Sequence, residues 1–114
     1  MKQNFSEIFS AAHSAGMKAL NDCIPVPMTV AGGNREWYVS EGACGFAWVE
    51  FAGNTAFGRW AKKTGNARPH YPSGLSVWVS EGGQSIARKE AYAQAFANVL
   101  RDFGIKAYAG SRLD

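Results

Sequence analysis

Residues 75–109 read LSVWVSEGGQSIARKEAYAQAFANVLRDFGIKAYA and predict a strand, a helix and a second strand in that order. Leu75 to Ser80 has the pattern of a strand with its aliphatic residues on one face. Ser85 is the predicted N-cap of a helix that runs to about Phe103, and Gly104 is the glycine that ends it. Ile105–Ala109 then forms the second strand. Since helices usually connect parallel strands, this unit predicts an α/β arrangement.

The front of the chain predicts a helix followed by an antiparallel meander of three strands. Asn4 and Glu7 have the spacing of a capping box, and an apolar stripe at helical spacing continues to about Asp22. The three strands of the meander are predicted at Val26–Ala31, Glu36–Ser40 and Ala43–Phe51. The third strand is apolar on both faces, so we predict that it is central and covered on both sides.

The middle of the chain predicts a short helix and a recognition loop. Thr55 is the predicted N-cap of a helix that ends at about Thr64. The loop from Gly65 to Gly74 contains two prolines together with polar and aromatic side chains. Loops of this composition commonly carry binding residues, so this segment is the best candidate for recognition.

Together these elements predict one domain over residues 1–114. The composition, 46% hydrophobic and 18% charged, is that of an ordinary globular protein. We expect an α/β fold, with α+β as the alternative, in which three helices accompany a mixed sheet of four or five strands with right-handed crossovers. Gly110–Asp114 is predicted to follow the last strand as a polar tail.

Composition and missing motifs exclude several classes of protein. No apolar run is long enough to span a membrane, and the first ten residues lack the apolar stretch of a signal peptide, so we expect a cytoplasmic protein. The two cysteines have neither the spacing of a zinc site nor the number needed for a disulfide framework. Phosphate-binding glycine loops and the motifs of metalloproteases and esterases are also missing. The sequence therefore predicts no metal site and no cofactor.

Three aromatic residues, Trp48, Trp78 and Tyr108, lie at the centres of predicted strands. If these strands are neighbours, the three rings form a row on one face of the sheet. Such a row can be core, a subunit interface, or a platform on which flat ligands stack. Because parallel sheets are normally covered on both faces, the sequence favours core or a dimer contact over an open platform.

A basic segment separates two of these strands. The stretch between Glu50 and Glu81 contains four lysines and arginines and no acidic residue. A local positive field of this kind attracts phosphates or an acidic protein surface. The residues predicted to bind an anionic partner are Arg59, Lys62, Lys63, Arg68, His70, Tyr71, Arg88 and Arg112.

Several short segments resemble small uncharacterised proteins encoded by bacteriophages and prophages. They are residues 44–49 (CGFAWV), 77–81 (VWVSE), 84–85 (QS), 88–91 (RKEA) and 108–112 (YAGSR). The resemblance implies no functional residue. It implies a phage accessory protein in the cytoplasm of a host bacterium, acting on host machinery, on nucleic acid or on a host defence.

The sequence favours a non-enzymatic binding protein that engages nucleic acid, a nucleotide-like ligand or an acidic host protein through its basic residues. A homodimer is a further expectation, and no membrane partner is expected. One alternative is a small enzyme acting on a phosphorylated or nucleotide substrate, with Glu41, Glu81 or His70 in acid–base roles. A second alternative is an inhibitor that docks onto a host protein through an exposed apolar patch.

Overall fold

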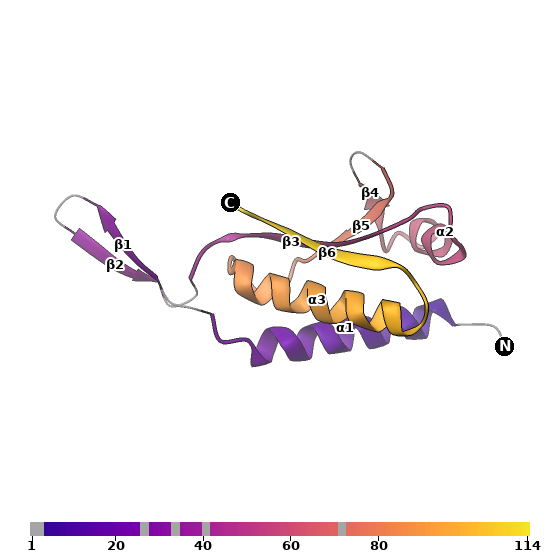
Figure 1. Cartoon of the computed structure of the whole chain (residues 1–114), viewed down its shortest axis with the longest axis horizontal. Helices are drawn as coiled ribbons and strands as arrows, with labels where there is room; N and C mark the ends of the chain where they lie inside the picture. Colours follow the sequence, from indigo (N-terminus) through magenta and orange to yellow (C-terminus); the bar gives the residue numbers. More distant parts are fainter. Residues whose placement is uncertain (1–3, 26–27, 33–34, 40–41, 71–72) are drawn as a thin grey trace.

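The computed structural model describes residues 4–25, 28–32, 35–39, 42–70 and 73–114 of the 114-residue chain. These residues form an α+β fold of three helices and a four-stranded antiparallel sheet, together with a separate two-stranded hairpin (Figure 1). The elements in chain order are α1 (Phe5–Asp22), β1 (Met28–Gly32), β2 (Arg35–Val39), β3 (Gly45–Phe51), α2 (Ala56–Lys63), β4 (Arg68–Pro69), β5 (Leu75–Trp78), α3 (Ile86–Asp102) and β6 (Ala107–Leu113).

The four-stranded sheet has the order β4–β5–β3–β6, and every neighbouring pair is antiparallel. The strands joined by α3, which are β5 and β6, therefore run parallel to each other but are separated by β3. The strands joined by α2, which are β3 and β4, are separated in the same way by β5. This is the split β-α-β arrangement. The prediction of a mixed sheet is wrong because a third strand lies between the two members of each helix-connected pair.

The predicted meander does not form. Its first two strands are confirmed as β1 and β2, but in the described residues they pair only with each other, and Figure 1 shows their hairpin apart from the main sheet. β3 pairs instead with β5 and, over seven residues, with β6. That longer ladder includes Gly110 to Leu113, so most of the predicted polar tail is strand. The predicted strand residues 26, 27 and 40 lie outside the described part of the chain.

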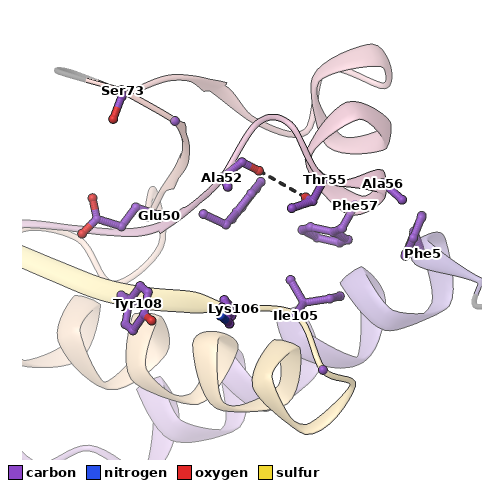
Figure 2. A pocket seen from close by; sticks show the side chains of 13 residues that line it. Phe5, Glu50, Ala52, Thr55, Ala56, Phe57, Ser73, Ile105, Lys106 and Tyr108 are labelled. Atoms are coloured by element: carbon purple, nitrogen blue, oxygen red, sulfur yellow. Dashed lines mark hydrogen bonds between the residues drawn. The ribbon is translucent and has the colours of Figure 1, made fainter.

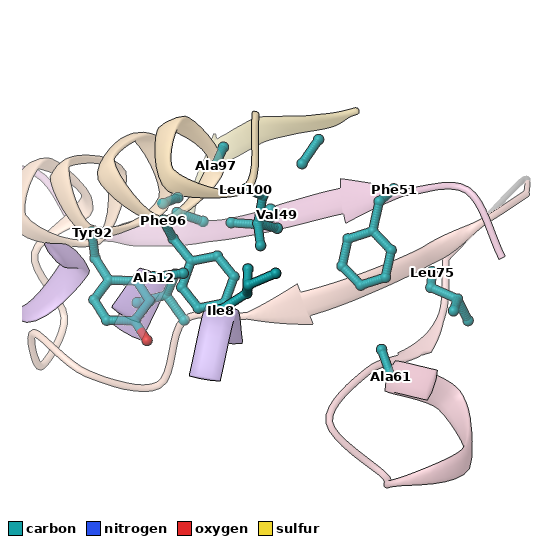
Figure 3. Close-up of a cluster of buried hydrophobic side chains, with 14 of the residues drawn as sticks. Ile8, Ala12, Val49, Phe51, Ala61, Leu75, Tyr92, Phe96, Ala97 and Leu100 are labelled. Atoms are coloured by element: carbon teal, nitrogen blue, oxygen red, sulfur yellow. The ribbon is translucent and has the colours of Figure 1, made fainter. Parts of the chain in front are cut away.

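The core lies on one side of the sheet. α3 packs against β3 and β6, and α1 packs against α3 on the side away from the sheet (Figure 1). Figure 3 shows Val49 of β3 close to Phe96 and Leu100 of α3, with Ile8 of α1 beside them. Phe51 lies further along β3, on the side of Leu75 and Ala61. Burial alternates strictly along β3, as expected for a strand with only one covered face. The central position of β3 is confirmed, but covering of both its faces is not.

The helix ends follow the predicted local chemistry. Asn4, Thr55 and Ser85 each accept a hydrogen bond from the backbone N–H three residues further on, which satisfies a donor that has no partner within the helix. Gly104 has a φ of 81°, a conformation that favours glycine and ends α3 before β6 begins. None of the described helices is long and apolar enough to cross a membrane.

Candidate functional site

The sheet face opposite α3 carries aromatic and charged side chains. Phe46, Trp48 and Glu50 alternate with the buried residues of β3 and so lie on this second face. Residues directly opposite on neighbouring strands share a face, which adds positions from β4, β5 and β6. This side of the sheet, called the aromatic face below, carries Phe46, Trp48, Glu50, Arg68, Ser76, Trp78, Tyr108, Gly110 and Arg112, of which Ser76 is buried. α1 and α3 both lie on the other side of the sheet (Figure 1).

Two tryptophans form the centre of the aromatic face. Trp48 and Trp78 are cross-strand partners, with ring centroids 5.0 Å apart and an interplanar angle of 32°. Trp78 is 36% exposed, and the ring of Phe46 extends the surface at 6.1 Å from it. These rings are not part of the buried core, so the expectation of a core role is wrong. The reason is that α1 packs on α3 rather than on this face.

On the β6 side of the row, a glycine replaces the expected third ring. Trp48 pairs with Gly110, and a Cβ atom at that position would lie 2.5 Å from the indole nitrogen. The absence of a side chain therefore allows the indole to lie against the β6 backbone. Tyr108 is opposite Glu50, two pairs further along and the next pair on this face, and is 58% exposed. The row is thus Trp78–Trp48–Gly110, with Tyr108 displaced from it.

Basic side chains surround the rings. The guanidinium carbon of Arg112 lies 5.3 Å from the centroid of the Phe46 ring, within the range of a cation–π interaction. Arg68 is exposed on the edge strand β4. His70 lies 6.0 Å from Trp48 between ring centroids, and its Nε2 is 2.7 Å from Oε2 of Glu50. The structure thus brings three residues predicted from the sequence, Arg68, His70 and Arg112, to one surface.

The predicted basic stripe on α2 is a separate surface. Arg59, Lys62 and Lys63 are exposed, and the guanidinium of Arg59 donates to the backbone carbonyl of Asn54 at 2.9 Å. The two lysines lie in the last turn of α2, where positive charge stabilises the helix dipole. No contact in the described part of the chain joins these three residues to the rings of the aromatic face.

Arg88 has an internal partner. Its Nη1 donates to the carbonyl oxygens of Leu20 at 3.0 Å and Cys23 at 3.2 Å, at the end of α1. This contact adds a charged donor at the end of α1, where the Leu20 carbonyl also accepts from the N–H of Cys23 at 3.3 Å, and ties α1 to the start of α3. Tyr71 and Glu41, named above as anion-binding and acid–base candidates, lie outside the described residues.

A second polar cluster links α1 to α3. Nδ1 of His13 hydrogen-bonds the hydroxyl of Tyr92 and lies 4.0 Å from a carboxylate oxygen of Glu81. Burial, and after it the negative charge of Glu81, raises the pKa of Tyr92, so the phenol stays neutral. The contacts of this cluster join α1, through His13, to Tyr92 of α3 and to Glu81 in the turn before α3. The acid–base role suggested for Glu81 stays a prediction.

A pocket of about 710 Å³ opens beside the aromatic face, at the end of β3 (Figure 2). Glu50 and Tyr108 line it on the side of the face, and Lys106 lies between Tyr108 and the end of α3. Its apolar wall includes Phe5 of α1 and Phe57 of α2, whose rings are in edge contact at 5.5 Å. The pocket is therefore continuous with the aromatic face through two shared residues.

No protein-family model, curated protein or solved structure matches this chain. The function is therefore inferred from side-chain geometry, and the phage setting implied by the sequence resemblance stays an expectation, as does the homodimer. Among the described residues, no group of three or more His, Cys, Asp or Glu side chains has an arrangement that would hold a metal ion.

Proposed function

We propose that this protein is a non-enzymatic module that binds single-stranded nucleic acid on its aromatic face. The observation that carries the proposal is the pair Trp48 and Trp78, which lie side by side on the two central strands of the sheet, on the face opposite α3, with Trp78 36% exposed. Unpaired bases stack on such rings, and each stacked base contributes about 1–3 kcal/mol of binding free energy.

The arrangement has a general precedent in RNA recognition. RNA-recognition motifs present a four-stranded sheet whose aromatic residues stack two or three bases. Here the two tryptophans lie on β3 and β5 of a four-stranded sheet, with α3 behind it. This is an analogy of arrangement, and the proposal rests on the side chains of the face rather than on the topology.

The charges on the aromatic face favour a polyanion over an acidic protein surface. Arg68 and Arg112 are both exposed at its borders, and Lys106 precedes β6 on the same side. Glu50 is the one carboxylate among the residues that define the face, and it is paired with His70. The exposed rings of Trp78 and Tyr108, with cations nearby, suit a strand whose bases stack while its phosphates meet positive charge. A purely apolar patch would instead favour protein docking.

Titration with fluorescent oligonucleotides tests this proposal. Single strands of about twelve nucleotides, as DNA and as RNA, should bind and quench tryptophan fluorescence, while a duplex of the same length binds weakly. Three phosphate contacts should give a slope of about −2 in log K against log salt. Equal affinity for the duplex, or binding without tryptophan quenching, would overturn the proposal. A protein partner that displaces no oligonucleotide would favour the docking alternative.

The enzyme alternative has one structural observation in its favour. His70 and Glu50 form a pair at 2.7 Å, an arrangement that is used for proton transfer. The same oligonucleotides, recovered after long incubation, decide between the two functions. Intact strands support binding alone, whereas cleavage that the His70→Ala variant abolishes would replace the binding proposal.

A further inference from the structure

We propose that the pocket beside Tyr108 is a base-recognition site that accepts one unstacked base of the bound strand and prefers guanine. The inference rests on the proposed function, because the base is delivered by a strand lying on the aromatic face. Its ligand class is a nucleobase whose Watson–Crick edge presents N–H donors. The site combines a position next to the stacking rings, apolar walls and one fixed carboxylate.

The position of the pocket follows from strand register. Glu50 and Tyr108 are opposite each other on β3 and β6, one pair along from Trp48 and Gly110 on the same face. Both residues also line the pocket. A strand stacked on Trp78 and Trp48 and continuing in the direction of Tyr108 therefore reaches the pocket mouth with its next base.

The walls of the pocket suit a flat ring. Phe51 is among the lining residues. Figure 2 shows Phe57 and Ile105 on the wall of the pocket and the exposed ring of Tyr108 at its border. A volume of about 710 Å³ falls within the usual range of roughly 300–1,000 Å³ for small-molecule sites. Apolar walls with a few polar groups are the usual composition of such sites, so a heterocyclic base can enter with most of its surface covered.

The polar groups define which base fits. Oε2 of Glu50 is occupied by His70 at 2.7 Å, which holds the carboxylate in place and leaves Oε1 as an acceptor. A carboxylate accepts hydrogen bonds and donates none, so it selects edges rich in N–H groups. Guanine presents an imino and an amino donor on one edge, and cytosine and adenine present an amino group. Uracil and thymine place carbonyl oxygens on both sides of their single N–H, which the carboxylate repels.

Lys106 supplies charge for the phosphate of the same nucleotide. Its side chain is exposed and lines the pocket beside Tyr108. The carboxylate inside the pocket and the cation at its mouth orient a bound nucleotide, so that its base lies inside and its phosphate lies outside. A free base would lack this second contact, so the site should favour a nucleotide.

The experiment compares oligo(dT) and oligo(U) of about eight nucleotides with the same strands carrying one terminal guanine, and includes free GMP. The proteins are the wild type, Glu50→Gln, Ala56→Trp and the control Glu90→Gln. Ala56 is exposed in the first turn of α2 and lines the pocket, so tryptophan there should fill it independently of any change at Glu50. Glu90 is an exposed carboxylate of α3 that does not line the pocket.

We expect the guanine-containing strand to bind the wild type and Glu90→Gln about tenfold more tightly than the strand without guanine. Glu50→Gln and Ala56→Trp should both reduce this preference to less than about twofold, each variant being compared on the two strands. Ala56→Trp, which lies outside the aromatic face, should in addition keep the affinity for oligo(dT) or oligo(U). Retention of the preference in either pocket variant, or no preference in the wild type, overturns the inference and leaves the aromatic face intact as a proposal. If no oligonucleotide binds but GMP binds the wild type and not Ala56→Trp, the proposed function fails and the pocket remains. If neither binds, both fail.

Discussion

Trp48 and Trp78 form a cross-strand pair in which no backbone hydrogen bond joins the two residues. The neighbouring residues do bond, since the N–H of Val79 donates to the carbonyl of Ala47 at 3.0 Å. Side chains of such non-hydrogen-bonded pairs lie closer together than those of the alternating pairs, which accounts for the 5.0 Å separation of the rings. The two indoles therefore act as one surface.

Truncation of either tryptophan should weaken binding of single strands. We expect Trp78→Ala and Trp48→Ala to lower affinity by roughly 5- to 150-fold each, the equivalent of about 1–3 kcal/mol for a lost stacked base. The fold should tolerate Trp78→Ala because this ring is 36% exposed. Phe103→Ala removes an exposed ring at the end of α3 and should leave affinity unchanged. Anisotropy titration measures all three, and a Trp78→Ala protein with wild-type affinity would contradict the stacking role.

A side chain at position 110 should displace the Trp48 ring. In Gly110→Val the new Cβ would lie 2.5 Å from the indole, so either the ring or the strand must move. Overpacking of this kind costs about 1–3 kcal/mol of unfolding free energy, and we expect weaker oligonucleotide binding with it. Ser111→Val places the same side chain at an adjacent exposed position of β6 and serves as the control. Urea unfolding and near-ultraviolet circular dichroism check the result, and an unchanged tryptophan signal would argue against the clash.

Charge reversal should distinguish the aromatic face from the basic stripe of α2. The double variant Arg68→Glu with Arg112→Glu should make the salt slope of binding shallower by about 1.4, because each lost phosphate contact on a single strand contributes about 0.7. Lys62→Glu with Lys63→Glu makes the same change in net charge on α2 and should leave the slope within about 0.3 of the wild type. The reverse result would return the binding site to α2, where the sequence alone placed much of it.

Arg88 should contribute to stability rather than to binding. Arg88→Met removes the donor to the carbonyls of Leu20 and Cys23, and we expect a loss of about 1–3 kcal/mol in unfolding free energy. Lys62→Met also removes one positive charge, at an exposed position, and serves as the matched control. Denaturant unfolding measures the stability of both variants, and oligonucleotide titration measures their binding. Unchanged stability together with weakened binding would restore the anion-binding role predicted from the sequence.

Alkaline pH should weaken the contact between α1 and α3 through Tyr92. Its pKa in the folded protein is raised above the ordinary value of 10.0, so the folded state keeps the phenolic proton at a pH where the unfolded state loses it. The stabilisation is complete below pH 10 and declines above it, by up to about 1.4 kcal/mol per pH unit. In Tyr92→Phe this titration is missing. The difference in unfolding free energy between wild type and variant should therefore shrink from neutral pH to about pH 11, and a constant difference would show that Tyr92 does not titrate.

Part of the candidate site was predictable from the sequence. Arg68, His70 and Arg112 were named from charge, and Trp48 and Trp78 from their places in predicted strands. Glu50 and Gly110 were missed as site residues, because their roles come from partners far away in the sequence: His70, just after β4, and Trp48 on β3. The alternation of Tyr108, Gly110 and Arg112 was the available signal that β6 extends to Leu113.

The sequence by itself determined the local structure of this protein. The caps at Asn4, Thr55 and Ser85, the glycine stop at Gly104 and the strand positions all depend on residues close together in the chain. Tertiary structure alone decided the order of the strands and hence which face is open. A helical connection sets the direction of the next strand but not its neighbour, and here β3 lies between β5 and β6. α1 then packs on α3, and in the described part of the chain neither helix packs on the face with Trp48 and Trp78.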